Sequence, residues 1–145
     1  MCLASIAMEK MLSMQIIDFG SAAPEISESR PQADRVLSGD PITTVNNFFS
    51  DASHGFHAGV WRSTAGRWRV SYSEHEFCHV TSGRVRIENQ QGRWEFGPGQ
   101  SFVVPAGFEG TWEVLEPMSK LYVIFEPPQG GHGTKDSLQD LCAPT

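Results

Sequence analysis

Residues 67–100 have the sequence RWRVSYSEHEFCHVTSGRVRIENQQGRWEFGPGQ, and this stretch decides the fold class. At its start Trp68, Val70 and Tyr72 alternate with polar residues, which is the two-residue period of a half-buried β-strand. Similar short segments recur between glycine, proline and polar breaks. They predict strands over residues 42–49, 59–64, 67–72, 76–83, 84–92, 93–99, 100–107, 111–116 and 119–126. Strands so closely spaced, with no helical segments between them, indicate an all-β sandwich or barrel and exclude a parallel α/β sheet.

The composition agrees with one small domain rich in turns. The 145 residues include 14 Gly and 9 Pro, and 39% of them are hydrophobic, which favours many short elements over a helical bundle. Asp and Glu number 17 against 11 Lys and Arg, so the formal net charge is −6. An acidic chain is poorly suited to phosphate backbones, and no window holds 18 uninterrupted apolar residues. We therefore expect neither a nucleic-acid partner nor a membrane span.

The two ends of the chain differ from its middle. We expect residues 1–13 to be a start extension or flexible arm, because their apolar stretch lacks the basic beginning of a signal peptide. Residues 14–58 are expected to form an irregular segment with one strand, packed on a barrel of residues 59–127, and residues 128–145 a polar tail. Four methionines are alternative starts: Met1, Met8, Met11 and Met14.

The chain has three cysteines, Cys2, Cys78 and Cys142. An odd number with two members near the ends argues against a disulfide framework and favours a reducing, cytoplasmic setting. Cys78 lies in an apolar run, where a free thiol behaves as a small buried hydrophobe rather than as a nucleophile.

A set of glycines, prolines and aromatic residues carries a family resemblance. It consists of Gly59-Val60-Trp61, Gly66, Trp68 to Tyr72, Glu76-Phe77, Gly83, Phe96 to Gln100, Pro105 to Glu113 and Lys120 to Ile124. With these residues the chain resembles the cupin superfamily, in particular small single-domain cupins of the cupin-3 (DUF861) type, related to ureidoglycine aminohydrolase and ethanolamine-utilisation cupins. The resemblance implies a jelly-roll barrel, a double-stranded β-helix, with an irregular N-terminal arm. It also implies a homodimer, and an arm that pairs with a neighbour's sheet would cover an exposed edge.

The same resemblance implies where a metal would be held. Metal-binding cupins take two histidines and a glutamate from the first motif and one histidine from the second. Glu76 falls on the glutamate, whereas Val70, Tyr72 and Gly110 stand in place of the histidines. A divalent transition metal held in the usual way is therefore not expected, and no cofactor is predicted. A metal recruited by Glu76 with other ligands stays the disfavoured alternative.

The five histidines present do not restore such a ligand set. On one strand, His75 and His79 would lie about 13 Å apart on the face opposite to Glu76. His54, His57 and His132 fall in predicted loops. We therefore expect the histidines to be solvated or at the edge of the core, and Glu74 to be solvated at the barrel mouth.

The strand alternation also defines a candidate site inside the barrel. We expect Glu76 to act as a general acid or base on a small polar metabolite, with Tyr72 as proton donor or orienting hydroxyl. Six further residues would line the ligand pocket: Trp68, Val70, Cys78, Trp112, Lys120 and Tyr122. The alternative is a structural hydrogen-bonded network in which Lys120 pairs with Glu76. A metal-poor enzyme, a non-catalytic module that binds or senses a small ligand, and a structural or assembly protein all stay open at this stage.

The basic residues suggest a second surface. Arg67 and Arg69 share one strand face, and Arg84 and Arg86 share another. If these two strands pair, the four side chains form a cationic outer patch for an anionic partner. A salt-bridged sheet face is the plainer interpretation.

Overall fold

The computed structural model describes Ser5 and residues 14–127, and the latter form an antiparallel all-β fold. Its elements are β1 (Glu25–Ser29), the short 3-10 helix η1 (Ala33–Arg35), β2 (Val36–Gly39), β3 (Thr43–Ser50), β4 (Phe56–Ser63), β5 (Gly66–Ser71), β6 (His75–Asn89), β7 (Gly92–Phe96), β8 (Ser101–Val104) and β9 (Glu109–Phe125). The predicted fold class is confirmed. The expected start extension apart from Ser5, the polar tail, Cys2, Cys142 and His132 lie outside the described residues. No helix in the described part of the chain is long and apolar enough to cross a membrane.

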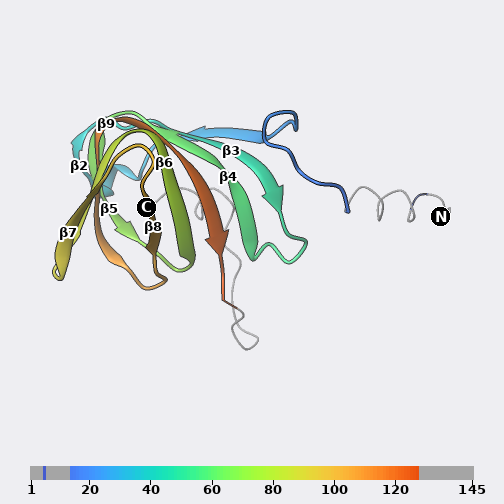
Figure 1. Ribbon diagram of the computed structural model, residues 1–145. Helices are drawn as coiled ribbons and strands as arrows, with labels where there is room; N and C mark the ends of the chain where they lie inside the picture. Colours follow the sequence, from blue (N-terminus) through green and yellow to red (C-terminus); the bar gives the residue numbers. More distant parts are fainter. Residues whose placement is uncertain (1–4, 6–13, 128–145) are drawn as a thin grey trace.

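The strands form one curled sheet with two halves that share β6 and β9 (Figure 1). In the first, called the β5 half, the order is β2-β5-β9-β6-β7, with β9 paired over residues 109–114. In the second, called the β4 half, the order is β1-β3-β4-β9-β6-β8, with β9 paired over residues 118–125. The side chains between the two halves form the core.

The two long strands correct the sequence prediction. Residues 76–83 and 84–92 were expected as separate strands, as were 111–116 and 119–126, but each pair lies in one bent strand, β6 or β9. Gly83 has the positive φ, 77°, that its position suggests, yet it lies within β6, where the register against β9 shifts. A Cβ at Gly83 would overlap the carbonyl oxygen of Pro117 on β9. Glycine therefore lets both strands bend from one half into the other.

The N-terminal segment also contains more strand than expected. Residues 14–58 were expected to be irregular except for one strand, but β1 pairs with β3 and β2 pairs with β5. Both are edge strands, whose backbone hydrogen bonds to a single neighbour require few buried side chains. Between them, η1 places Arg35 beside β5.

Three tryptophans from three strands form the centre of the core. Trp61, Trp68 and Trp112 are completely buried. The ring centroid of Trp61 lies 5.9 Å from that of Trp112, edge to face, and 6.3 Å from that of Trp68. Because β4, β5 and β9 contribute one ring each, this contact joins the β4 half to the β5 half.

Candidate functional site

A cluster of polar side chains lies inside the barrel around one carboxylate oxygen. Oε1 of Glu76 accepts hydrogen bonds from Nζ of Lys120 at 2.9 Å, the hydroxyl of Tyr72 at 3.2 Å and Sγ of Cys78 at 3.3 Å. Glu76 and Cys78 are two residues apart on β6 and point to the same face. Lys120 faces them from β9, and Tyr72 directly follows β5. Glu76 is 1% exposed and Lys120 is fully buried. The predicted site residues Glu76, Tyr72, Cys78 and Lys120 are thus brought together in one network.

Aromatic rings enclose the ammonium of Lys120. Its Nζ lies 4.7 Å from the ring centroid of Trp61 and 4.4 Å from that of Trp112, within the range of cation–π attraction. A buried charge is costly unless it is paired, and here the carboxylate and two π faces compensate the cation. Burial lowers the pKa of Lys120, but Cys78 and Glu76 more than offset this, so its pKa is raised overall.

The other two members of the cluster are held in their neutral forms. Burial raises the pKa of the Tyr72 hydroxyl and of the Cys78 thiol well above their ordinary values, and the charge of Glu76 raises both further. Cys78 is therefore a thiol at neutral pH, which fits its expected role as a buried hydrophobe rather than a nucleophile.

The residues at the positions where the resemblance would place metal ligands do not fit a metal ion. Val70 and Gly110 face each other across β5 and β9, and neither side chain offers a ligand atom. A Cβ at Gly110 would overlap the carbonyl oxygen of Glu88, so no imidazole could stand there without moving β6. The Glu76 oxygen is already bonded to an ammonium. No group of three or more His, Cys, Asp or Glu suitable for a metal occurs among the described residues.

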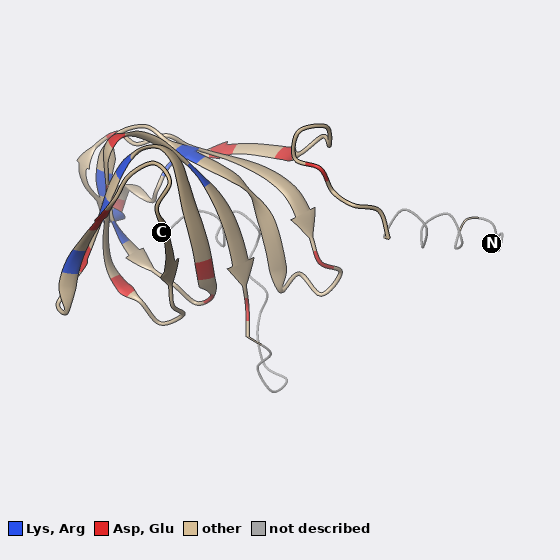
Figure 2. Ribbon diagram, viewed as in Figure 1, with Lys and Arg blue, Asp and Glu red and all other residues tan. Residues whose placement is uncertain are grey.

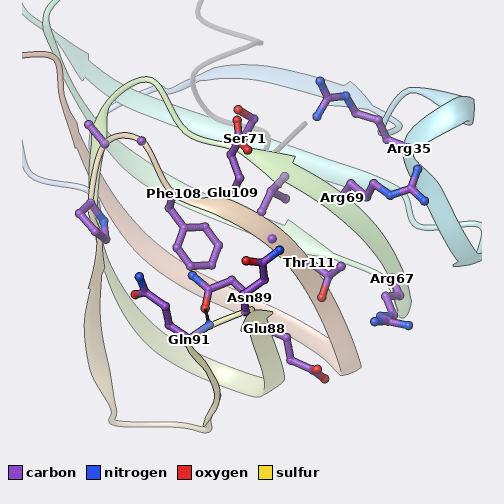
Figure 3. Close-up of a pocket in the computed structure, with 16 residues that line it drawn as sticks. Arg35, Arg67, Arg69, Ser71, Glu88, Asn89, Gln91, Phe108, Glu109 and Thr111 are labelled. Carbon is purple, nitrogen blue, oxygen red and sulfur yellow. Dashed lines mark hydrogen bonds between the residues drawn. The ribbon is translucent and has the colours of Figure 1, made fainter.

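A broad cavity of about 1030 Å³ lies at the rim of the barrel, over the end of β5, the start of β9 and the end of β6. Arg35, Arg67 and Arg69 lie along one side of it, and Phe108 and Gln91 along the other (Figure 3). Among the described residues, Arg67 and Arg69 form no ion pair. Of the two glutamates in the lining, Glu88 is paired with Arg93 at 3.0 Å. The other, Glu109, stands opposite Ser71 at the end of β5. The lining therefore holds more arginine than free carboxylate, which favours an anionic group.

A smaller cavity of about 350 Å³ adjoins the first one and is apolar. Its lining includes Phe96 and Phe102, which stack with ring centroids 4.1 Å apart, and Trp94, which is 42% exposed. None of the residues that line it is charged. The two cavities have four lining residues in common: Asn89, Gln91, Pro105 and Phe108.

The predicted site residues lie mostly away from these cavities. Val70 lines the broad cavity, whereas neither cavity is lined by Glu76, Tyr72, Trp68, Cys78, Trp112, Lys120 or Tyr122. The cavities instead use Arg35, Asn89, Gln91 and Phe108, which the sequence analysis did not select. Arg35 came from the segment expected to be irregular, and Asn89 and Gln91 from a stretch interpreted only as a turn.

The expected patch of four arginines is wrong in its strand pairing. β9 lies between β5 and the second half of β6, so Glu113 stands opposite both Arg67 and Arg86. Arg86 pairs with Glu95 at 2.6 Å and with Glu113 at 3.1 Å. The hydrogen bond between Arg86 and Glu95 raises the pKa of Arg86 and lowers that of Glu95. Arg86 is thus compensated, whereas Arg67 and Arg69 on β5 form no ion pair among the described residues.

Two further side chains are more buried than predicted. His57 lies in β4 rather than in a loop, and its Nδ1 is 2.8 Å from the Ser50 hydroxyl while its Nε2 is 3.0 Å from the His54 carbonyl oxygen. Burial lowers the pKa of His57. Glu74, expected to be solvated, is 6% exposed and accepts a hydrogen bond from Ser73. His54 lies in the loop between β3 and β4, as predicted.

Comparisons with known proteins agree with this fold. Residues 50–122 match the EutQ-like cupin domain. A protein of unknown function of the DUF861 family from Pseudomonas syringae pv. tomato is 25% identical, with a TM-score of 0.65, over 74% of this chain and 46% of its own. This chain thus spans less than half the length of that protein. Comparison with curated proteins gives no match.

Two EutQ proteins are similar in fold. The EutQ protein of Clostridium difficile is 15% identical, with a TM-score of 0.54, over 68% of this chain and 74% of its own. A putative ethanolamine utilization protein Q from Salmonella typhimurium LT2 is 11% identical, with a TM-score of 0.55, over 75% of this chain and all of its own.

Proposed function

Because this chain belongs to the family of EutQ-like cupin domains, we propose that it binds a small polar metabolite that carries a negative charge, at the rim of the barrel. The observation that carries this proposal is the position of Arg67 and Arg69, which line the broad cavity without an ion pair among the described residues. A guanidinium presents several donors in a plane and suits a carboxylate or phosphate group.

The neighbouring polar groups support this assignment. Register across the sheet places Thr111 beside Arg69, and Ser71 follows two residues later on the same face of β5. Both hydroxyls line the cavity and can bond to polar groups of the ligand. Arg35 approaches from η1 on the same side as the other arginines (Figure 3).

In this proposal the Glu76 cluster is the internal support of the site. Its ion pair is enclosed by the core, lines neither cavity and links β6 to β9. Acid–base catalysis by Glu76 and Tyr72 stays the alternative prediction, and it requires that the ligand reach the interior beneath Val70. Binding that survives in Glu76→Gln while any turnover is lost would favour this alternative.

The proposed binding is tested by replacing the free cations. Arg67→Gln with Arg69→Gln should weaken the affinity for a binding anion at least about ten-fold, since each charged hydrogen bond contributes about 1.5–3 kcal/mol. Titration calorimetry with inorganic phosphate, succinate and a set of small carboxylates is the measurement. Arg62→Gln, an exposed arginine of β4, is the matched control. Equal affinities of the double variant and the control would contradict the proposal.

We also propose that the protein is a homodimer through the outer face of the β4 half. Cross-strand register aligns one row of side chains there: Val103, Phe77, Val123, Ala58 and Phe49. Val103 is 60% exposed and Phe77 44%. The ribbons of β3 and β4 are almost free of charged residues (Figure 2). A two-fold interface places a patch against itself, and an uncharged row does so without like-charge repulsion.

A further inference from the structure

A serine and a histidine form a hydrogen-bonded pair at the hairpin of β3 and β4. Ser50, the last residue of β3, stands opposite His57, the second residue of β4. The Ser50 Oγ lies 2.8 Å from Nδ1 of His57. Neither residue lines the two cavities or takes part in the proposed anion site. A hydroxyl this close to an imidazole, with the imidazole held by a third group, is the arrangement that activates a serine as a nucleophile.

The surroundings of His57 fix which of its nitrogens carries the proton. Nε2 lies 3.0 Å from the carbonyl oxygen of His54, and because a carbonyl can only accept a hydrogen bond, Nε2 is the protonated nitrogen. His57 is 1% exposed, and this burial lowers its pKa. The ring is therefore neutral at neutral pH, and Nδ1 is left as an acceptor. The Ser50 hydroxyl consequently donates to Nδ1, as a general base requires.

Ser50 is held from its other side by two buried side chains. Nδ2 of Asn47 donates to the Ser50 Oγ at 2.8 Å, and the Tyr122 hydroxyl donates to Oδ1 of Asn47 at 2.7 Å. Both Asn47 and Tyr122 are buried, whereas Ser50 is only half-buried. These bonds keep the serine oxygen in place and direct its proton to the imidazole, while part of the side chain stays open to a small molecule.

The loop between β3 and β4 positions the third member of this group. His54 has a φ of 57°, in the left-handed region that is uncommon for residues other than glycine. Its amide donates to the Asp51 carbonyl at 2.8 Å, and the Asp51 amide donates to the Phe56 carbonyl at 2.9 Å. These bonds hold the His54 carbonyl against the imidazole. Backbone strain of this kind concentrates at functional sites, and here it serves to orient His57.

A second serine–histidine pair, on β8 and β6, lacks such a third group. The Ser101 Oγ lies 2.7 Å from Nδ1 of His79, and each of the two is more exposed than its counterpart in the first pair. In the described part of the chain, no hydrogen bond is made to Nε2 of His79. Ser101 therefore has a neighbouring base without a fixed orientation. It offers a comparison in which exposure is greater and activation is absent.

We infer that Ser50 is a nucleophile, activated by His57, for small acyl esters of phenols. The Ser50 oxygen attacks the ester carbonyl carbon while its proton passes to Nδ1 of His57. The bond from that carbon to the phenol oxygen then breaks, and the imidazolium returns the proton to this oxygen, which leaves an acyl ester on Ser50 and a free phenol. Water deprotonated by His57 hydrolyses the acyl ester, and the products are a carboxylic acid and the restored serine.

The test uses the full chain and p-nitrophenyl acetate. We expect peptide mass spectrometry of acid-quenched samples to find an acetyl group on Ser50. Ser50→Ala and His57→Gln should each slow the release of p-nitrophenol at least about one hundred-fold, since a positioned general base contributes about 10²–10⁴ in rate. Ser101→Ala is the matched control and should react at the parent rate. Ser38→Ala, at an exposed serine of β2 away from the proposed dimer row, is a second control.

The acetyl group on the parent protein reports activation even if a variant does not fold. Its absence from Ser50, or an equal amount on Ser101, would overturn the assignment and leave the bonds of His57 as a support of the hairpin. A folded His57→Gln variant that acetylates Ser50 at the parent rate would overturn the role of the base. Arg67→Gln with Arg69→Gln should leave the reaction unchanged, so this result is separable from the proposed function.

Discussion

In the barrel interior, the charge of one buried carboxylate is compensated by a side chain of the same chain. Lys120 supplies a positive charge beside Glu76, so the carboxylate is compensated by a cation that belongs to the chain. The rings of Trp61 and Trp112 shield this cation from water. The pair supports the fold only while both members are present. One buried charge without its partner costs far more free energy than an uncharged side chain at the same place.

Removing one member of the pair should therefore destabilise the fold strongly. Lys120→Met leaves a buried carboxylate without its cation, and we expect the free energy of unfolding to fall by about 3–5 kcal/mol. The double change Glu76→Leu with Lys120→Met should recover much of this loss. Denaturant unfolding followed by tryptophan fluorescence measures both. A single variant as stable as the parent would show that the pair contributes nothing.

The same cluster should make the fold sensitive to alkaline pH. The pKa values of Cys78, Tyr72 and Lys120 are all raised above their ordinary values of 9.0, 10.0 and 10.5. In each case the folded state holds its proton to a higher pH than the unfolded state. The associated stability is thus complete below about pH 9 and is lost as pH rises above it, with a slope of up to about 1.4 kcal/mol per pH unit for each group.

Unfolding experiments between pH 8 and 11, a range chosen to span the ordinary values of about 9 to 10.5, measure this loss. Tyr72→Phe removes one titrating group, so its stability should fall less steeply above about pH 10. A flat profile in the parent protein over the whole range would contradict the expected proton linkage.

At the scale of elements, two bent strands build the molecule. β6 and β9 each run through both halves, and the bend of β6 depends on Gly83, which combines a positive φ with close approach to Pro117. At the rim of the barrel, the start of β9 likewise requires a glycine, because Gly110 lies directly against the backbone of Glu88 on β6. Glycines at these two positions allow neighbouring strands to approach more closely than side chains would permit.

Gly83 and Gly99 offer a matched comparison of these effects. Both have a positive φ, 77° and 84°, but a Cβ at Gly99 would meet nothing within 4 Å. Gly99→Ala should lower the free energy of unfolding only by the cost of placing alanine in the left-handed conformation, about 1–2 kcal/mol. Gly83→Ala adds the collision with β9, and we expect a loss at least about twice as large. Thermal unfolding measures both, and equal losses would show that the contact between β6 and β9 is not tight.

At the scale of the whole molecule, the two halves have different outer faces. Around the β5 half, arginines and glutamates alternate across the strands, whereas the row across the β4 half carries no charge. Our proposals place the ligand at the rim beside the β5 half and a second copy of the chain against the apolar row of the β4 half. Ligand binding and dimerisation are thus expected to use separate surfaces.

The proposed dimer is tested by a charge placed in its apolar row. Phe77→Glu should convert a dimer into a monomer, because two copies of the carboxylate would be buried against apolar side chains. Leu37→Glu, at a similarly exposed position on β2, should leave the dimer intact. Sedimentation equilibrium over a range of protein concentrations is the measurement. A parent protein that is monomeric throughout, or a dimer that survives Phe77→Glu, would contradict the proposal.

Much of the fold was predictable from local patterns. Alternation predicts most strands and places Glu76 and Cys78 on one face of their strand, because side chains two residues apart point the same way. It left open whether Lys120, on another strand, faces the interior; the register of β9 against β6 decides this. Turn residues locate the corners. The same local signals could not tell a corner from a bend within one strand, since Gly83 has a positive φ in either case.

The sequence by itself therefore determined the fold class and the family resemblance and named the candidates for the buried cluster, all of which depend on neighbours along the chain. Only the tertiary structure decided which strands lie side by side. It separated Arg67 from Arg86 by placing Glu113 of β9 between them, and it brought Arg35 and Phe108 to one rim. Pairing between distant strands depends on the course of the whole backbone, which no local pattern specifies.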